Sequence, residues 1–147
     1  MTMKMEIEFR GKRADNKEWV YGDLLNLHNG DKYIVNNKFG ACIDDKGNFI
    51  NTESPFVCKV IPETVGQYTC VKDINKKKIY EYDRVKCKGV ETLGTVLFDG
   101  GSFGIEFDKP IAEDWTSTAL YCLINEEGFA ECEVIGNIFD KEIDNGD

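Results

Sequence analysis

The sequence predicts a mainly β protein, in which a β-rich N-terminal region precedes a small SH3-like β-barrel and helices are few and short. Short runs that alternate apolar and polar residues recur along the chain, and turns rich in glycine, asparagine and aspartate separate them. After residue 79, strands of about five residues are joined by tight glycine turns, a pattern typical of small, strongly bent barrels. Hydrophobic residues make up 41% of the chain and charged residues 31%, so it can bury a core without a metal or a disulfide.

The first half of the chain is expected to form strands joined by polar turns. Residues 5–9 alternate apolar and polar with a period of two, as a half-buried strand does. Residues 29–31, Asn-Gly-Asp, are a turn signal before a short strand. Pro62 ends the strand before it or leaves that strand on an edge. The expected strands are 5–9, 18–27, 32–35, 56–61 and 65–68, with a hairpin over 41–50 around the turn at 44–48.

Glycine and charged turns also separate the strands expected in the second half. Residues 73–78 are polar and basic and predict a turn, and Asp99-Gly100-Gly101 predicts a tight hairpin. Residues 110–115 fit a loop, and residues 117–124 fit either a short helix or a strand. The expected strands are 84–87, 94–98, 103–107 and 131–139, and the polar residues 141–147 are expected to fray.

Strand pattern and charge both change near residues 62–72, which predicts a domain boundary there. We place an N-terminal β-rich region at 1–61 and the SH3-like barrel region, with its acidic C-terminal part, at 62–147. Residues 1–61 carry no net charge, 62–88 carry +3, and 89–147 carry −12, within a total of −9. An acidic surface repels phosphate and suits a basic protein partner, although acidity also simply keeps a protein soluble.

Targeting signals and metal motifs are missing from the sequence. No stretch approaches the ~18 apolar residues of a membrane helix, and the first ten residues lack the apolar core of a signal peptide, so we expect a cytoplasmic protein away from membranes. The six cysteines are widely spaced, without a Cys-x-x-Cys pair, and His28 is the one histidine. We expect buried free thiols, no metal and no cofactor.

Residues for catalysis do not form a recognisable constellation. His28 lies beside a turn, and no serine, threonine or cysteine near it forms a motif in which the histidine would act as the base of a nucleophile. Neighbouring carboxylates such as Glu113-Asp114 fit solvated loops, and Gly100-Gly101-Ser102 fits a hairpin rather than a phosphate loop. We therefore expect a protein that is not an enzyme, with a carboxylate site for a divalent ion as the enzymatic alternative.

Six blocks along the chain carry a resemblance to a known family: 7–10, 20–24, 61–69, 78–81 with Asp83 and Val85, 101–105 and 134–138. They resemble the YopX family of phages and prophages. The blocks keep the family's order and approximate spacing from about residue 7 to about residue 139, with 30–55 matching least. The resemblance implies a protein of the host cytoplasm, a β-rich fold with an SH3-like part, and self-assembly, but it implies no activity.

Two positions depart from the family pattern, because Cys70 and Tyr82 stand where the family usually has glycine. Glycine at such positions often supplies a positive φ. We expect either that these turns have changed, or that Cys70 and Tyr82 adopt a positive φ at some energetic cost.

Aromatic residues of the expected barrel are the candidate binding residues. Tyr80, Tyr82, Phe98 and Phe103 lie around the expected turns, and rings exposed together on a barrel rim would grip a partner. The alternative is that they fill the barrel core. The leading hypothesis is a non-enzymatic module that binds another protein or assembles with itself.

Two further binding roles follow from charge. The basic stretch Lys72–Lys88 could bind nucleic acid, with the aromatics stacking on bases, although the overall charge disfavours this. The acidic C-terminal half could imitate DNA and inhibit a host enzyme, although its carboxylates are scattered among apolar positions.

Overall fold

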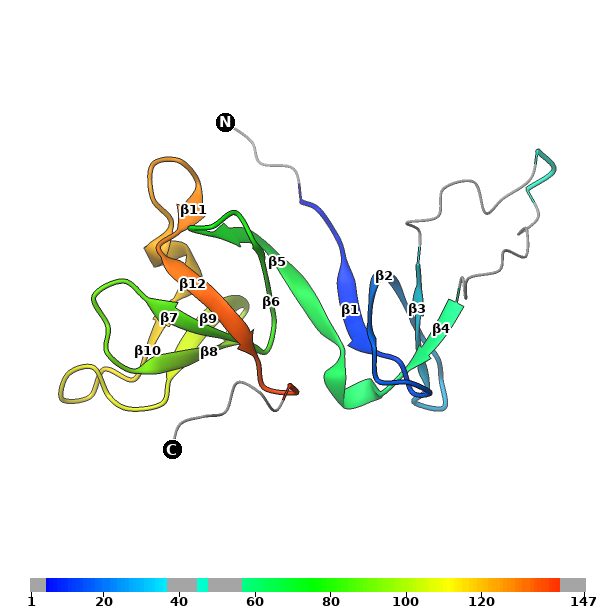
Figure 1. The fold of residues 1–147 in the computed structure, drawn as a ribbon, viewed down its shortest axis with the longest axis horizontal. Helices are drawn as coiled ribbons and strands as arrows, with labels where there is room; N and C mark the ends of the chain where they lie inside the picture. Colours follow the sequence, from blue (N-terminus) through cyan, green and yellow to red (C-terminus); the bar gives the residue numbers. More distant parts are fainter. Residues whose placement is uncertain (1–4, 37–44, 48–56, 141–147) are drawn as a thin grey trace. The chain divides into compact units, whose positions relative to one another are not determined.

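The computed structural model describes residues 5–36, 45–47 and 57–140, and these form a mainly β protein (Figure 1), as predicted. The described helical elements are two short 3-10 turns, η2 (Pro62–Thr64) and η3 (Leu120–Leu123). The chain divides into two compact units, Met1–Gln67 and Tyr68–Asp147, with the division inside strand β5.

Antiparallel strands form the first unit, in the order β5-β1-β2-β3-β4. Ile34, Cys58 and Val60 are its buried apolar side chains. Gly22 lies where β2 passes β3 so closely that a Cβ there would stand 1.9 Å from the carbonyl oxygen of Val35. The strands are β1 (Phe9–Lys12), β2 (Trp19–Asn26), β3 (Lys32–Val35), β4 (Val57–Val60) and the start of β5 (Gly66–Asp73).

The second unit contains an antiparallel five-stranded sheet in the order β10-β9-β8-β7-β12. The remainder of β5 pairs with β6 and, in parallel, with the short β11. Ten buried apolar residues, among them Ile79, Val85, Val96 and Ile105, form one core in this unit. The strands are β6 (Lys78–Tyr80), β7 (Asp83–Cys87), β8 (Leu93–Asp99), β9 (Ser102–Phe107), β10 (Ser117–Ala119), β11 (Phe129–Ala130) and β12 (Cys132–Asn137).

This sheet is not closed into the barrel that the sequence predicted, because β10 and β12 lie at its two ends and do not pair with each other. The outer edge of β12 is instead covered by the turn after β5. There the Ile74 N–H donates to the Cys132 carbonyl at 3.1 Å, and the Val134 N–H donates to the Asp73 carboxylate at 2.8 Å.

Several element boundaries differ from the prediction. Residues 5–8 lie outside any strand although they alternate, because β1 begins to pair only at Phe9. Strand β5 continues past residue 68 to Asp73, since its polar residues pair with β6. Residues 117–124, which fitted a helix or a strand, divide into β10 and η3. The hairpin expected over 41–50 lies outside the described residues, apart from a turn at 45–47.

Candidate functional site: the aromatic end of the five-stranded sheet

Apolar and aromatic side chains gather at one end of the five-stranded sheet. Neighbouring strands are antiparallel, so the start of β7, the end of β8, the start of β9 and the end of β12 meet at the same end. The Tyr82 N–H donates to the Val96 carbonyl at 2.7 Å, and the Ile138 N–H donates to the Tyr82 carbonyl at 3.1 Å. Five residues at or next to these strand ends make up what we call the aromatic end: Tyr82, Phe98, Phe103, Ile138 and Phe139.

The β8–β9 hairpin supplies the first ring pair. Phe98 and Phe103 face each other in the register of the two strands, with ring centroids 5.0 Å apart and planes at 71°. Phe103 is half-buried and packs against the core, whereas Phe98 is 55% exposed. The half-buried Phe103 thus holds Phe98 in place, and Phe98 presents a rigid apolar surface to solvent.

Tyr82 and Phe139 form a second edge-to-face pair, with ring centroids 5.5 Å apart and planes at 80°. Burial raises the pKa of the Tyr82 phenol, and so do the negative charge of Glu81 and the hydrogen bond to it. Beside this pair, Ile138 is 49% exposed. Glu81, Asp99 and Asp140 are chain neighbours of Tyr82, Phe98 and Phe139, and the Glu81 carboxylate is hydrogen-bonded to Tyr82.

Of the four aromatics predicted to line a rim, the structure brings three to this end of the sheet. The fourth, Tyr80, is 5% exposed in β6 and stacks on Tyr68 with centroids 5.6 Å apart, so it belongs to the interior. Sequence reasoning missed Ile138 and Phe139. The signal for Ile138 and Phe139 was an apolar pair directly after β12. The sequence pattern had placed both residues inside the predicted strand 131–139.

Polar residues of the family-like blocks hold the backbone in place. Thr64 Oγ1 donates to the Ile61 carbonyl and accepts the Lys12 N–H, at 2.7 and 2.9 Å. Thr69 Oγ1 donates to the Ile79 carbonyl at 2.8 Å. The same role belongs to two further buried side chains: Asp83 accepts the Tyr80 N–H at 2.7 Å, and Asn137 accepts the Phe139 N–H at 2.8 Å.

A sequence comparison identifies the family. The family model described as YopX protein matches residues 8–142. The chain belongs to the YopX family. No curated protein matched the chain.

Both departures from the usual glycines of the YopX family are visible in the backbone. Cys70 has φ 70° and Tyr82 has φ 76°, in the left-handed region that favours glycine. Cys70 belongs to an irregularity in which residues 69–71 of β5 face only Ile79 of β6. Of the two outcomes expected from the sequence, the structure thus has the second, in which Cys70 and Tyr82 adopt a positive φ.

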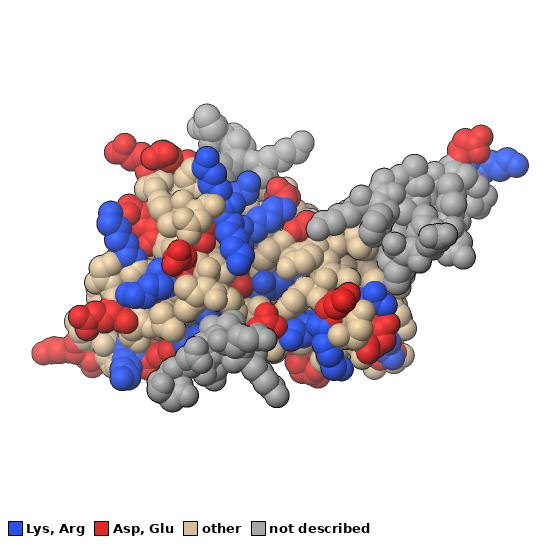
Figure 2. All heavy atoms as spheres, in the orientation of Figure 1, with Lys and Arg blue, Asp and Glu red and all other residues tan. Residues whose placement is uncertain are grey.

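The basic stretch of unit 2 is partly neutralised. Arg84 makes a bidentate pair with Asp108 at 2.6 and 2.7 Å, and Lys88 pairs with Glu131 at 3.2 Å. Lys76 and Lys77 are exposed in the turn between β5 and β6. Figure 2 shows basic side chains gathered over the face where β5 and β11 lie, with acidic side chains around them.

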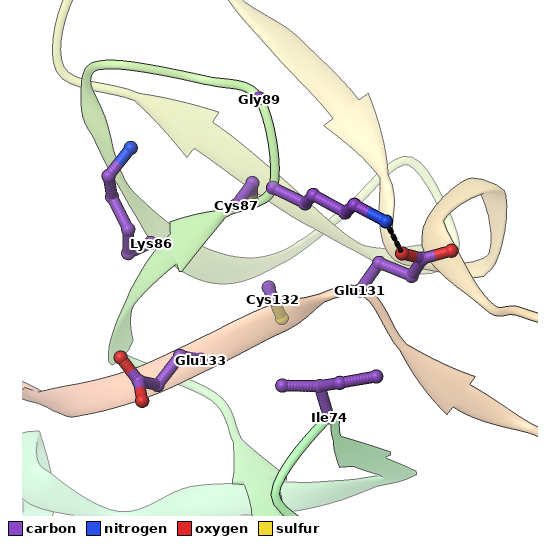
Figure 3. A pocket seen from close by; sticks show the side chains of 8 residues that line it. Ile74, Lys86, Cys87, Gly89, Glu131, Cys132 and Glu133 are labelled. Atoms are coloured by element: carbon purple, nitrogen blue, oxygen red, sulfur yellow. Dashed lines mark ion pairs between the residues drawn. The ribbon is translucent and has the colours of Figure 1, made fainter.

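A hollow of unit 2 lies over the end of β7 and the start of β12, which are paired strands (Figure 3), and it has a cavity volume of about 390 Å³. It is lined by Ile74, Lys86, Cys87, Lys88, Gly89, Glu131, Cys132 and Glu133. Within the described ranges, no three or more His, Cys, Asp or Glu side chains are grouped to hold a metal ion. In the same ranges, the structure has no helix with the length and apolar character to cross a membrane.

Proposed function

We propose that this YopX protein is a non-enzymatic module that binds a basic segment of another protein at its aromatic end. The observation that carries the proposal is the exposure of Phe98, 55%, on a ring pair that is itself anchored in the core. Aromatic anchors that are already ordered lose little conformational entropy on binding, which makes them effective contact residues.

Charge supports a basic partner. Four of the five residues of the aromatic end lie in residues 89–147, which carry −12, and Tyr82 lies in the preceding stretch, 62–88. Lysine and arginine side chains can lay their apolar stems and cationic heads on aromatic rings, while nearby carboxylates attract them from a distance. Affinity for such a segment should therefore fall as salt rises.

The polar residues in the blocks that resemble the YopX family make hydrogen bonds to the backbone, which also favours binding over catalysis. Thr64, Thr69, Asp83 and Asn137 accept hydrogen bonds from backbone groups, so their side chains are engaged in holding turns and strand ends. These residues therefore build a scaffold, and the aromatic end is a surface that this scaffold presents.

Binding can be tested with a peptide array that contrasts lysine- and arginine-rich sequences with glutamate-rich ones of the same apolar content. Bound peptides would then be titrated against the full chain and the variants Phe98→Ala and Trp115→Ala. Trp115 is a matched control, since it is 53% exposed but precedes β10 at the opposite end of the sheet. We expect Phe98→Ala to weaken binding about tenfold or more, and Trp115→Ala to leave it nearly unchanged. Equal effects of the two variants would refute the assignment.

The same surface could be covered by a second copy of the chain, and solution mass separates this outcome from binding of a different protein. Light scattering coupled to size exclusion would give an integer multiple of 16.7 kDa for a self-assembled protein. Self-assembly through the aromatic end predicts that Phe98→Ala is monomeric. An assembly that persists in this variant would use another surface.

Nucleic-acid binding is the second candidate, favoured by the exposed Lys76 and Lys77 in the turn after β5. This turn contacts the start of β12 at Cys132, whereas the aromatic end lies beyond the last residue of β12. The lysines and rings therefore do not converge as base stacking requires. Single-stranded DNA binding at low salt that is lost in a Lys76→Glu, Lys77→Glu variant would support this role, and no binding at low salt would exclude it.

A further inference from the structure

Two cysteines distant in the sequence stand directly opposite each other in the five-stranded sheet. Cys87 of β7 and Cys132 of β12 are register partners. Each is a free thiol with 2% exposure, and both belong to the core of unit 2. They also line the open hollow over the end of β7 and the start of β12 (Figure 3).

The hydrogen-bond pattern places this pair at a non-hydrogen-bonded position of the ladder. The next residues along, Lys88 and Glu131, are joined by an N–H to carbonyl bond of 3.1 Å, and hydrogen-bonded and non-hydrogen-bonded pairs alternate in antiparallel ladders. The Cys87 carbonyl accepts from Val90, and the Cys132 carbonyl accepts from Ile74, each at 3.1 Å, so both point away from the partner strand. Cα atoms of such pairs are about 4.5 Å apart, within the range that a disulfide spans.

The two thiols already interact. A hydrogen bond with Cys132 lowers the pKa of Cys87, against its burial and with help from the positive charge of Lys86. The same hydrogen bond raises the pKa of Cys132, as do burial and the charges around it. The hydrogen bond thus favours a thiolate on one sulfur of the pair while the other sulfur keeps its proton.

We infer that Cys87 and Cys132 are an oxidation site, at which a hydroperoxide that enters the hollow converts the two thiols into an intramolecular disulfide. The thiolate of the pair attacks the peroxide oxygen, the O–O bond breaks, and the leaving oxygen takes a proton to become water or an alcohol. The partner sulfur then attacks the sulfenic sulfur, and its proton leaves with the hydroxyl as water. Two thiols lose two hydrogens in total, one peroxide is reduced, and a dithiol reductant reverses the change.

Other cysteines of the described residues lack this arrangement. Cys58 stands opposite Ile34 in the β3–β4 ladder. Cys122 is exposed in η3, outside any ladder, so it can be oxidised but has no cross-strand thiol to resolve the product. It therefore provides a matched control.

The test treats the full chain with hydrogen peroxide and maps the product by non-reducing peptide mass spectrometry. We expect a crosslinked pair of peptides that contain Cys87 and Cys132, with a mass lower by two hydrogens, lost again on treatment with dithiothreitol. Cys122→Ser should still form the crosslink, and Cys132→Ala should not. The oxidised wild type should melt about 10 °C higher than the reduced protein, because the disulfide closes a long loop.

The mapping on wild type needs no variant to fold, so it tests the site even where Cys132→Ala is unstable. If peroxide oxidises Cys122 while Cys87 and Cys132 stay reduced, or links Cys87 to any other cysteine, the assignment is overturned. An oxidised protein that melts at a lower temperature than the reduced one would show that the bridge strains the sheet, and would equally contradict the geometry argued above.

Discussion

Replacing Cys70 by glycine and by alanine measures the cost of its positive φ directly. Neither substitute has a side chain beyond Cβ, so the pair differs mainly in backbone preference. At φ 70° a residue with a Cβ is strained by roughly 1–2 kcal/mol, and glycine is not. Glycine loses about 0.5–1 kcal/mol more conformational entropy on folding than alanine. The difference leaves Cys70→Gly more stable than Cys70→Ala by about 0.5–1 kcal/mol.

The sign of this difference is what makes the experiment decisive. At a negative φ, alanine makes the protein more stable than glycine does. Cys122 lies in η3 and is not one of the described residues that have a positive φ. We expect Cys122→Ala to be more stable than Cys122→Gly, the reverse of the order at Cys70. Urea unfolding followed by far-UV circular dichroism and by tryptophan fluorescence gives both differences, and two probes reveal separate unfolding of the two units. Cys70→Ala equal to or more stable than Cys70→Gly would refute the reasoning.

Three further perturbations have outcomes that follow from single contacts. Gly22→Ala places a Cβ 1.9 Å from a backbone oxygen and should destabilise the first unit by roughly 3 kcal/mol or more, measured by urea unfolding. Asp73→Asn puts an amide where the buried carboxylate accepts three backbone N–H groups, and should cost about 2 kcal/mol in the same assay. Asp108→Asn should cost about 0.5 kcal/mol at pH 7, because the solvent-exposed pair with Arg84 is screened. The hydrogen bond from Arg84 lowers the pKa of Asp108 below its usual 3.8, so this difference should be present above pH 4 and vanish as pH falls through the folded-state pKa.

The first two of these perturbations have a control variant in the same unit. Gly30→Ala, in an open turn with no atom within 4 Å of the added Cβ, carries only backbone strain and should cost less than Gly22→Ala. Asp99→Asn, at an exposed hairpin tip, should leave stability nearly unchanged where Asp73→Asn does not. A stability difference between Asp108→Asn and wild type that grows at low pH would show that the ion pair with Arg84 does not stabilise the fold.

Local patterns in the sequence were enough to predict the positions of many strands. The strand at 32–35 and the hairpin around Asp99-Gly100-Gly101 depend on neighbouring residues alone, namely alternation and glycine turns, and the structure has both. The departures at Cys70 and Tyr82 could also be read from the sequence, because the preference for glycine at positive φ is a property of a single residue.

Long-range pairing decided the rest. Residues 5–8 alternate like a strand, but strand structure needs a partner, and β1 finds one only from Phe9 onward. Tyr80 and Phe98 look alike in the sequence, yet one lies against Tyr68 in the interior and the other stands at a hairpin tip.

By itself, the sequence determined the mainly β class, the YopX membership and the turns, because period-two patterns and glycine preferences act within a few residues. Only the tertiary structure decided that the five-stranded sheet stays open, which aromatics share one end of it, and that Cys87 meets Cys132. These features depend on which strand lies beside which, and the energy that selects those neighbours comes from burying side chains distant in sequence in a common core.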